Sequence, residues 1–144
     1  LFVALSPQLE WNTNFTYMLE SEDKQTGEPL SVIPEYTLNS SLDWQVTQQL
    51  SLQLTGTYYG KQEAPSLNRR TGEAIDADAQ QDLDPYGLVG VSAGYEFNSN
   101  YSLRVSISNL LDKQIYREGN ANDAGANTYN EPGRAYFASV TASF

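Results

Sequence analysis

The sequence predicts an all-β protein with antiparallel strands, and three observations support this. Apolar and polar residues alternate with a period of two over six segments, and no long apolar run occurs. The connections between the segments alternate between short and long. Aromatic residues gather toward the ends of the segments. A period of two is typical of strands that present one apolar and one polar face.

Composition excludes several classes of protein. The 144 residues contain no Cys and no His, and 18 acidic against 8 basic residues give a net charge of −10. Mean hydropathy is −0.50. Without Cys and His, disulfide frameworks, thiolate metal sites and the commonest general base are absent from this sequence. The acidic balance argues against nucleic acid as a partner. We therefore expect no enzyme, no metal site and no resident cofactor.

The first three alternating segments are rich in Leu, Trp and Tyr on one parity and in Ser, Thr, Asn and Gln on the other. They are LEWNTNFTYML at 9–19, YTLNSSLDWQV at 36–46 and LSLQLTGTYYG at 50–60. The last three are YGLVGVSAGYEF at 86–97, YSLRVSI at 101–107 and AYFASVTASF at 135–144. The preceding LFVAL, at 1–5, predicts the end of one more strand.

The alternation of connection lengths points to a particular kind of antiparallel sheet. Short connections such as TQQ and NSN join some strands, whereas long ones such as SEDKQTGEPLSVI join the others. Outer-membrane barrels have short turns at one end and long loops at the other, and their strands need only about ten alternating residues. We interpret the chain as an antiparallel transmembrane β-barrel segment of about six complete strands.

Aromatic residues of the apolar parity separate into two predicted membrane-interface girdles. The girdle near the long connections comprises Tyr17, Tyr36, Tyr58 and Tyr136. The girdle near the short turns comprises Trp11, Trp44, Tyr95, Phe97, Tyr101 and Phe144. At ~3.3 Å per residue, Tyr36 and Trp44 lie about 26 Å apart, or roughly 19 Å along the membrane normal after tilting. Such spacing fits interfacial aromatic rings, whereas a soluble β-sandwich would bury them in a core.

Six strands do not close a membrane barrel, because the smallest such barrels have about eight. An open sheet would leave backbone donors unpaired in lipid. We therefore expect residues 1–144 to be the C-terminal part of a larger barrel.

Three stretches resemble TonB-dependent siderophore receptors. They are SNLLDKQIYREGNA from Ser108 to Ala121, TYNEPGRAYFASVTASF from Thr128 to Phe144, and LDPYGLVGVSAGYEF at 83–97. Leu111 departs from the family pattern, which more often has Phe there. YGKQEAP at 59–65 is most similar to the ferric enterobactin and related catecholate receptors.

The resemblance implies a bacterial outer-membrane, multi-pass barrel of about 22 strands that imports ferric siderophores. It implies an N-terminal plug domain, absent from this chain, through which a TonB-type protein supplies energy. Iron is then cargo, carried as the ferric siderophore, and no residue is catalytic. Further implied partners are outer-membrane lipid, lipopolysaccharide and the barrel-insertion machinery, which would read the terminal aromatic Phe144.

Basic residues are concentrated on the long-connection side. Seven of the eight lie in long connections or at the adjoining strand ends, and only Arg104 lies within a strand. Ferric catecholates are anionic and aromatic, so Arg, Lys and Tyr at this side would attract and stack on them. The predicted ligand-binding residues are Lys61, Arg69, Arg70, Tyr116, Arg117 and Tyr129. The same bases could instead bind lipopolysaccharide phosphates or simply be solvated.

Other interpretations remain open at this point. A porin without a plug, or an adhesin built on a barrel, would share the strand pattern. The acidic run DADAQQDLD at 76–84 predicts a solvated loop, because it lacks the glycine and the spaced glutamate of a calcium loop. Asp112 and Lys113 could form an ion pair at a strand end.

Overall fold

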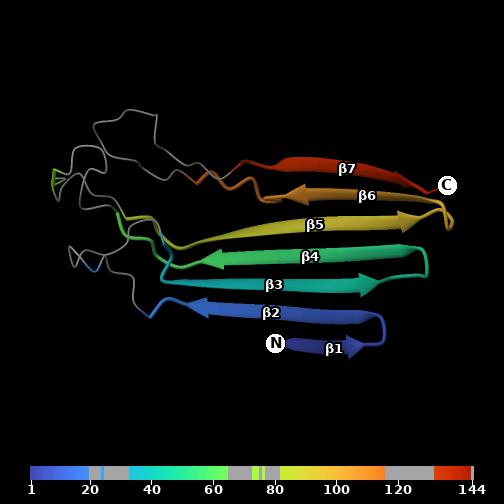
Figure 1. Cartoon of the computed structure of the whole chain (residues 1–144), viewed down its shortest axis with the longest axis horizontal. Helices are drawn as coiled ribbons and strands as arrows, with labels where there is room; N and C mark the ends of the chain where they lie inside the picture. The colour runs from blue at the N-terminus through green and yellow to red at the C-terminus, as the bar shows by residue number, and fades with distance from the viewer. Residues whose placement is uncertain are drawn as a thin grey trace.

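The computed structural model describes residues 1–19, 24, 33–64, 73–74, 76, 82–115 and 132–143. Within them, seven strands form one sheet in the order β1-β2-β3-β4-β5-β6-β7, and every neighbouring pair is antiparallel (Figure 1). Consecutive strands are therefore always neighbours. The sheet is open, since β1 and β7 each pair on one side only in the part of the chain described.

The strands are β1 Phe2–Ser6, β2 Leu9–Tyr17, β3 Tyr36–Gln45, β4 Leu50–Tyr59, β5 Tyr86–Glu96, β6 Tyr101–Ser108 and β7 Ala135–Ala142. The six predicted strands are confirmed, and the LFVAL segment forms most of β1. No helix among the described residues has the length and apolarity that crossing a membrane would require.

All the short turns lie at one end of the sheet and the long connections leave from the other (Figure 1). The β5–β6 turn shows how a short sequence specifies a reversal. The Asn98 side-chain oxygen accepts the N–H groups of Asn100 and Tyr101 at 2.9 and 3.0 Å, which mimics a backbone turn. The Phe97 N–H then donates to the Tyr101 carbonyl at 3.0 Å.

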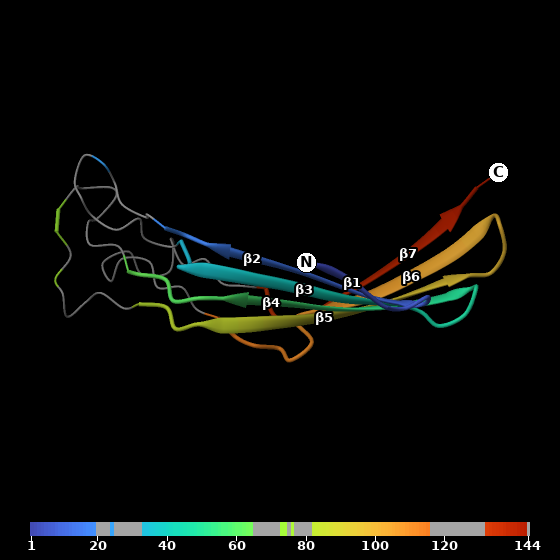
Figure 2. The same ribbon diagram turned by 90° about the horizontal axis from the view of Figure 1, so that it is seen from below.

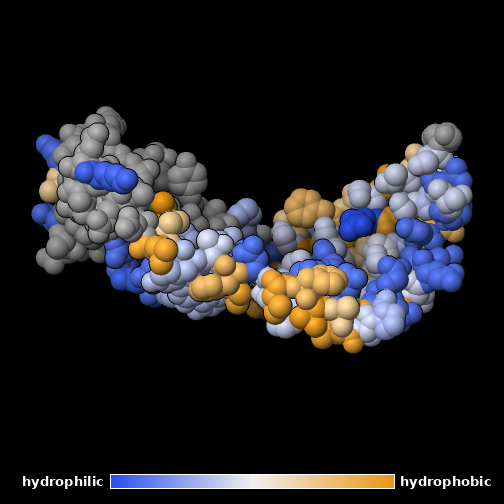
Figure 3. Space-filling view, turned by 60° about the horizontal axis from the view of Figure 1, so that its bottom comes forward, coloured by the Kyte–Doolittle hydropathy of each residue, from blue (hydrophilic) through white to orange (hydrophobic). Residues whose placement is uncertain are grey.

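The period of two gives the sheet two chemically different faces. We call the side that carries Trp44, Leu54 and Val105 the apolar face, and the side that carries Asp43, Gln53 and Arg104 the polar face. Figure 3 shows hydrophobic residues gathered along one curved side and hydrophilic residues near the short-turn end. Phe137 is an exception to the pattern, because it lies on the polar side of β7, opposite Ser106.

The sheet is a single curved layer that nothing among the described residues covers (Figure 2). Only Tyr86 and Ile115 are buried hydrophobic residues in the described part. Large apolar side chains stay exposed instead, at 73% for Val140 and 62% for Phe15. A soluble sandwich would bury such side chains between two sheets, so that alternative is not supported.

The predicted girdle residues of the described strands sort to the two ends. Near the long connections, the Tyr36 ring lies 6.0 Å from Phe15 and 6.1 Å from Tyr58. Near the short turns, Tyr95 and Phe97 meet edge to face at 5.0 Å. Trp11 lies opposite Leu42, and its indole N–H donates to the Ser40 hydroxyl at 2.7 Å. Phe144 lies outside the described residues.

We predict that Gly60→Ala destabilises the intact protein and that Gly56→Ala does not. A Cβ at Gly60 would lie 2.7 Å from the Tyr36 ring, whereas a Cβ at Gly56 has nothing within 4 Å. Overpacking costs about 1–3 kcal/mol. Denaturant unfolding of both variants measures this difference, and equal unfolding midpoints would contradict it.

Candidate functional site

The candidate ligand-binding residues belong to the end of the sheet from which the long connections leave. We call the described residues at this end the rim; they are 18, 35, 59–64, 82–86, 109–115 and 132–134. Of the predicted candidates, Lys61 lies in the rim. The others, Arg69, Arg70, Tyr116, Arg117 and Tyr129, lie outside the described residues.

Lys61 follows the end of β4 and is held by an ion pair. Its Nζ lies 2.6 Å from Asp82 Oδ2, and both side chains are nearly half exposed. The other Asp82 oxygen accepts the Ala64 N–H at 3.0 Å. Gln62 and Leu83 exchange N–H···O bonds of 3.1 and 2.9 Å between the same two segments. The connection between β4 and β5 is thus closed at its base by a backbone bridge and an ion pair.

This pairing changes the proton affinity of both groups. The hydrogen bond from Lys61, followed by that from the Ala64 N–H, lowers the pKa of Asp82 below its ordinary 3.8. The hydrogen bond to Asp82 raises the pKa of Lys61 above its ordinary 10.5. The pair is therefore fully charged near neutral pH. It weakens as the pH falls through the lowered pKa of Asp82 or rises through the raised pKa of Lys61.

The surroundings of Lys61 are acidic. Besides Asp82, the carboxylates of Glu63 and Glu35 also raise its pKa. The Lys61 carbonyl accepts the Glu35 N–H at 3.0 Å, which ties the base of β3 to the end of β4. An anionic ligand therefore contacts the Lys61 ammonium only if it displaces the Asp82 carboxylate or shares the ammonium with it. Because the pair is nearly half exposed, such an exchange costs little free energy.

Two tyrosines of the rim lie on the polar face and were not among the sequence-based candidates. Tyr59 ends β4, and Tyr86, directly opposite, begins β5. Their ring centroids are 4.9 Å apart, and Tyr86 is 2% exposed. Their parity, opposite to that of Tyr58, is the signal that places them on the polar face. The contact between the two rings joins the end of β4, two residues before Lys61, to the start of β5.

Gln62 is the one described residue whose side-chain amide is buried without a partner. It is 2% exposed, and neither Nε2 nor Oε1 has a hydrogen-bond partner among the described contacts. Burying an amide without hydrogen bonds costs about 1–3 kcal/mol. Its backbone, by contrast, is fully used in the bridge to Leu83.

Two further bases of the rim are exposed. Lys113 precedes the long β6–β7 connection and Arg134 follows it. Neither forms an ion pair with another described residue, whereas Lys61 does. Their exposure and position make them additional candidates for anion contact, which the sequence pattern alone did not single out.

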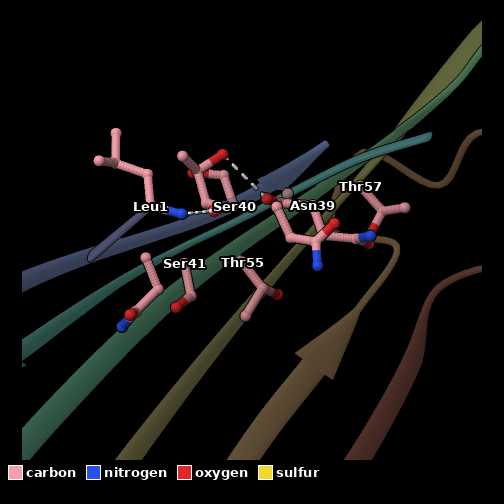
Figure 4. A pocket seen from close by; sticks show the side chains of 10 residues that line it. Leu1, Asn39, Ser40, Ser41, Thr55 and Thr57 are labelled. Atoms are coloured by element: carbon pink, nitrogen blue, oxygen red, sulfur yellow. Dashed lines mark hydrogen bonds between the residues drawn. The ribbon is translucent and has the colours of Figure 1, made fainter. Parts of the chain in front are cut away.

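Away from the rim, the polar face is organised by side-chain hydrogen bonds. Asp43 accepts the Ser41 hydroxyl at 2.9 Å and the Gln53 amide at 2.6 Å. Thr57 donates to Asn39 at 3.0 Å. Figure 4 shows a hollow nearer the rim, of about 430 Å³, into which Asn39, Ser41, Thr55 and Thr57 contribute polar atoms. This face is suited to polar partners rather than to lipid.

The described residues offer noncovalent recognition. No group of three or more metal-ligating side chains occurs among them. The rim instead combines cations, carboxylates and aromatic rings, which can bind a ligand that is both charged and aromatic.

Comparison with known proteins identifies the same fold and related sequences. The family profile described as "TonB dependent receptor-like, beta-barrel" matches residues 3–110. The ferric enterobactin receptor PirA of Pseudomonas aeruginosa is 57% identical over 144 residues, which are all of this chain and 19% of that protein. The ferrienterobactin receptor of Escherichia coli is 44% identical over 156 aligned residues, covering all of this chain and 21% of that protein.

Solved structures agree. A mutant of the ferric enterobactin receptor PfeA from Pseudomonas aeruginosa, in complex with enterobactin, superposes with a TM-score of 0.87 at 47% identity, covering all of this chain and 21% of that one. The siderophore receptor PirA of Acinetobacter baumannii superposes at 0.80 with 40% identity, over 99% of this chain and 21% of that one. The chain thus spans about a fifth of the length of the relatives it matches.

We predict that the Ala64 amide is protected from hydrogen exchange by the charged form of Asp82. Asp82→Ala should lower its protection factor at neutral pH. In the unsubstituted protein the same loss should occur as the pH falls below the ordinary carboxyl range, since the Asp82 pKa is lowered. Glu63→Ala is the matched control and should leave the amide protected. Unchanged protection in Asp82→Ala would contradict the closure by this carboxylate.

Proposed function

The chain belongs to the TonB-dependent receptor β-barrel family, and from this premise we propose that it is part of a receptor for ferric siderophores. The proposed ligands are catecholates of the enterobactin type, imported with energy from a TonB-type protein. Sequence identity to ferric enterobactin receptors over all of the chain is the observation that carries this proposal.

The chemistry of the rim supports an aromatic anion as ligand. Lys61, Lys113 and Arg134 supply positive charge at the described strand ends, and Tyr59, which is partly exposed and packs on the buried Tyr86, supplies aromatic surface. A ferric catecholate carries negative charge on aromatic rings, so both kinds of group favour it. Arg69, Arg70, Tyr116, Arg117 and Tyr129 extend the same chemistry into the adjoining connections.

The two faces support a location in the bacterial outer membrane as a multi-pass barrel. The apolar face has no charged residue along the described strands and suits lipid, with lipopolysaccharide at the rim. The polar face suits the plug domain, through which the TonB-type protein would act. Phe144 would be read by the barrel-insertion machinery. Iron enters only as the ferric siderophore, so no resident cofactor is required.

Transport by such a receptor requires no covalent chemistry. The relatives are named as receptors, and the chain has neither the His nor the Cys that most nucleophilic mechanisms use. The same names favour a ligand-specific receptor over a plugless porin or an adhesin.

We predict that the full-length parent protein in detergent binds ferric enterobactin tightly. Combined replacement of Lys61, Arg69, Arg70 and Arg117 by Ala should raise Kd at least about tenfold, because each lost charged hydrogen bond is worth about 1.5–3 kcal/mol. Fluorescence quenching on titration measures Kd. Lys24→Ala, which removes a base from a different long connection, is the matched control.

The possible outcomes test the identity of the ligand and the role of the four residues separately. Absence of binding by the unsubstituted protein would overturn the enterobactin-type ligand. Tight binding that the combined variant retains would keep the ligand and reject these four residues.

The proposed orientation of the faces makes a second prediction. Leu54→Lys, at the middle of β4 on the apolar face, should destabilise the folded full-length protein in lipid by about 2–4 kcal/mol. Gln53→Lys, one residue away on the polar face and beside Asp43, is the control and should cost much less. Unfolding in lipid vesicles measures both, and equal costs would contradict a lipid-facing Leu54.

A further inference from the structure

The segment directly after β6 contains two residues in a backbone conformation that L-amino acids rarely adopt. Asn109 has φ 46° and Asp112 has φ 53°. Asn and Asp tolerate this left-handed region better than other non-glycine residues. The Asp112 N–H donates to the Asn109 carbonyl at 2.8 Å, and the Leu110 N–H donates to the Val89 carbonyl of β5 at 2.7 Å. The chain therefore turns sharply as soon as β6 ends.

The Asn109 side chain uses this turn to reach across the β6–β7 connection. It is 6% exposed. Its Nδ2 donates to the carbonyls of Lys113 at 2.9 Å and Pro132 at 3.0 Å. Its Oδ1 accepts the Lys113 N–H at 2.9 Å. One buried amide thus joins residues that are 23 positions apart in the sequence.

Asp112 makes a second link between the same two segments. Its Oδ1 accepts the Arg134 N–H at 2.8 Å, one residue before β7 begins. The ion pair expected between Asp112 and Lys113 is absent from the described contacts, because the carboxylate is turned toward the β7 side instead. Gly133 lies so close that a Cβ there would be 3.1 Å from Asp112 Oδ1. The close approach of the two segments therefore favours glycine at 133.

The pairing of β7 with β6 needs such a device, because its own pattern specifies the register weakly. A one-residue slip would exchange the two faces of a strand. On the apolar face of β7, Tyr136 and Val140 alternate with the small Ala138 and Ala142, while the bulky Phe137 lies on the polar face. Phe137 therefore offsets part of the burial preference for this register over the slipped one. A long connection also gives no turn geometry to fix the register, unlike a short hairpin loop.

We propose that Asn109 and Asp112 form a side-chain clamp that sets the β6–β7 register independently of the connection between them. The clamp holds Pro132 and Arg134 against the end of β6, so that Ala135 pairs with Ser108. The remaining β6–β7 residue pairs are then fixed in the same register. The β4–β5 connection has a related closure, since Asp82 accepts the Ala64 N–H across its base. This role concerns assembly of the sheet and does not depend on the identity of the ligand.

Disulfide trapping in the full-length parent protein tests the clamp. Val105 lies directly opposite Ala138, so a Val105→Cys/Ala138→Cys pair reports the native register. A Val105→Cys/Ser139→Cys pair can close only after a one-residue slip, because disulfides require Cα atoms within about 7 Å and side chains on the same face. Residues 1–144 contribute no other Cys. Peptide mapping under nonreducing conditions measures the yield of each link.

Two glycine variants distinguish the effect of the side-chain hydrogen bonds from that of the backbone conformation. Asn109→Gly and Asp112→Gly keep the left-handed conformation and remove only the side-chain bonds. Each variant removes one bond that crosses to the β7 side, and such a bond is worth about a factor of five. Each variant should therefore lower the 105–138 to 105–139 ratio about fivefold, and the double variant should lower it more. Asp112→Asn keeps an acceptor oxygen and should restore much of the ratio. Leu111→Ala, at an exposed position between the two, is the control.

A further variant tests the independence from the connection. Replacing residues 116–131 by a short Gly-Ser linker should preserve the native link, and adding Asn109→Gly to that background should lower it. The proposal is overturned if the double glycine variant keeps the native ratio, if Leu111→Ala lowers it equally, or if the linker alone shifts it. If the double variant does not assemble, the single variants and Asp112→Asn give the same decision.

Discussion

Antiparallel pairing in an uninterrupted register is the constraint on which the other features of this chain depend. A single layer with an uncovered apolar face can satisfy its backbone groups only within the sheet, and in lipid an unpaired group costs several kcal/mol. The register then decides the chemistry of each face, because side chains alternate. Pairing Glu10 with Asp43, and Leu54 with Leu42 and Val91, puts acids on one side and aliphatic residues on the other. The faces are therefore consequences of the pairing.

The rim lies where the backbone hydrogen-bond ladder of the sheet ends. Beyond that point, side chains of the rim also form hydrogen bonds between neighbouring segments. Beyond β4, Asp82 accepts the Ala64 N–H; beyond β6, Asp112 accepts the Arg134 N–H. Between β3 and β4 the Lys61 carbonyl accepts the Glu35 N–H. The first two bonds join segments that a long connection separates in sequence, whereas the third joins the two outer ends of the β3–β4 hairpin. Lys61 is a ligand-binding candidate because it is basic. It also helps to hold neighbouring segments together at this end of the sheet.

The strands could be predicted from sequence because alternation is a local signal, and all six expected strands are present together with the seventh at the start of the chain. The contacts of the rim could not, because each joins residues far apart. Asp82 belongs to an acidic run that the sequence predicts as solvated, yet it pairs with Lys61. Asn109 was recognisable only as part of a family resemblance, and Asp112 otherwise only as a possible partner of Lys113, since nothing local reveals a left-handed turn or the contact with Pro132. Phe137 has the wrong parity for its hydrophobicity, and only the register places it.

The net charge of the chain does not by itself decide whether the rim attracts an anionic ligand. Of the 18 acids, only Glu10, Asp43 and Glu96 lie toward the short-turn end of the sheet, and the other 15 lie in the long connections or in the rim. Asp43 lies about seven residues along β3 from Tyr36, or about 23 Å at ~3.3 Å per residue. At physiological ionic strength the Debye length is about 8 Å, so Asp43 and its neighbour Glu10 contribute little potential where a ligand would first arrive. The acids that matter are those within one Debye length of the bases. At Lys61 these acids offset the positive charge, whereas Lys113 and Arg134 form no ion pair with a described residue. The local balance at the rim, rather than the net charge of the chain, therefore governs attraction of an anion.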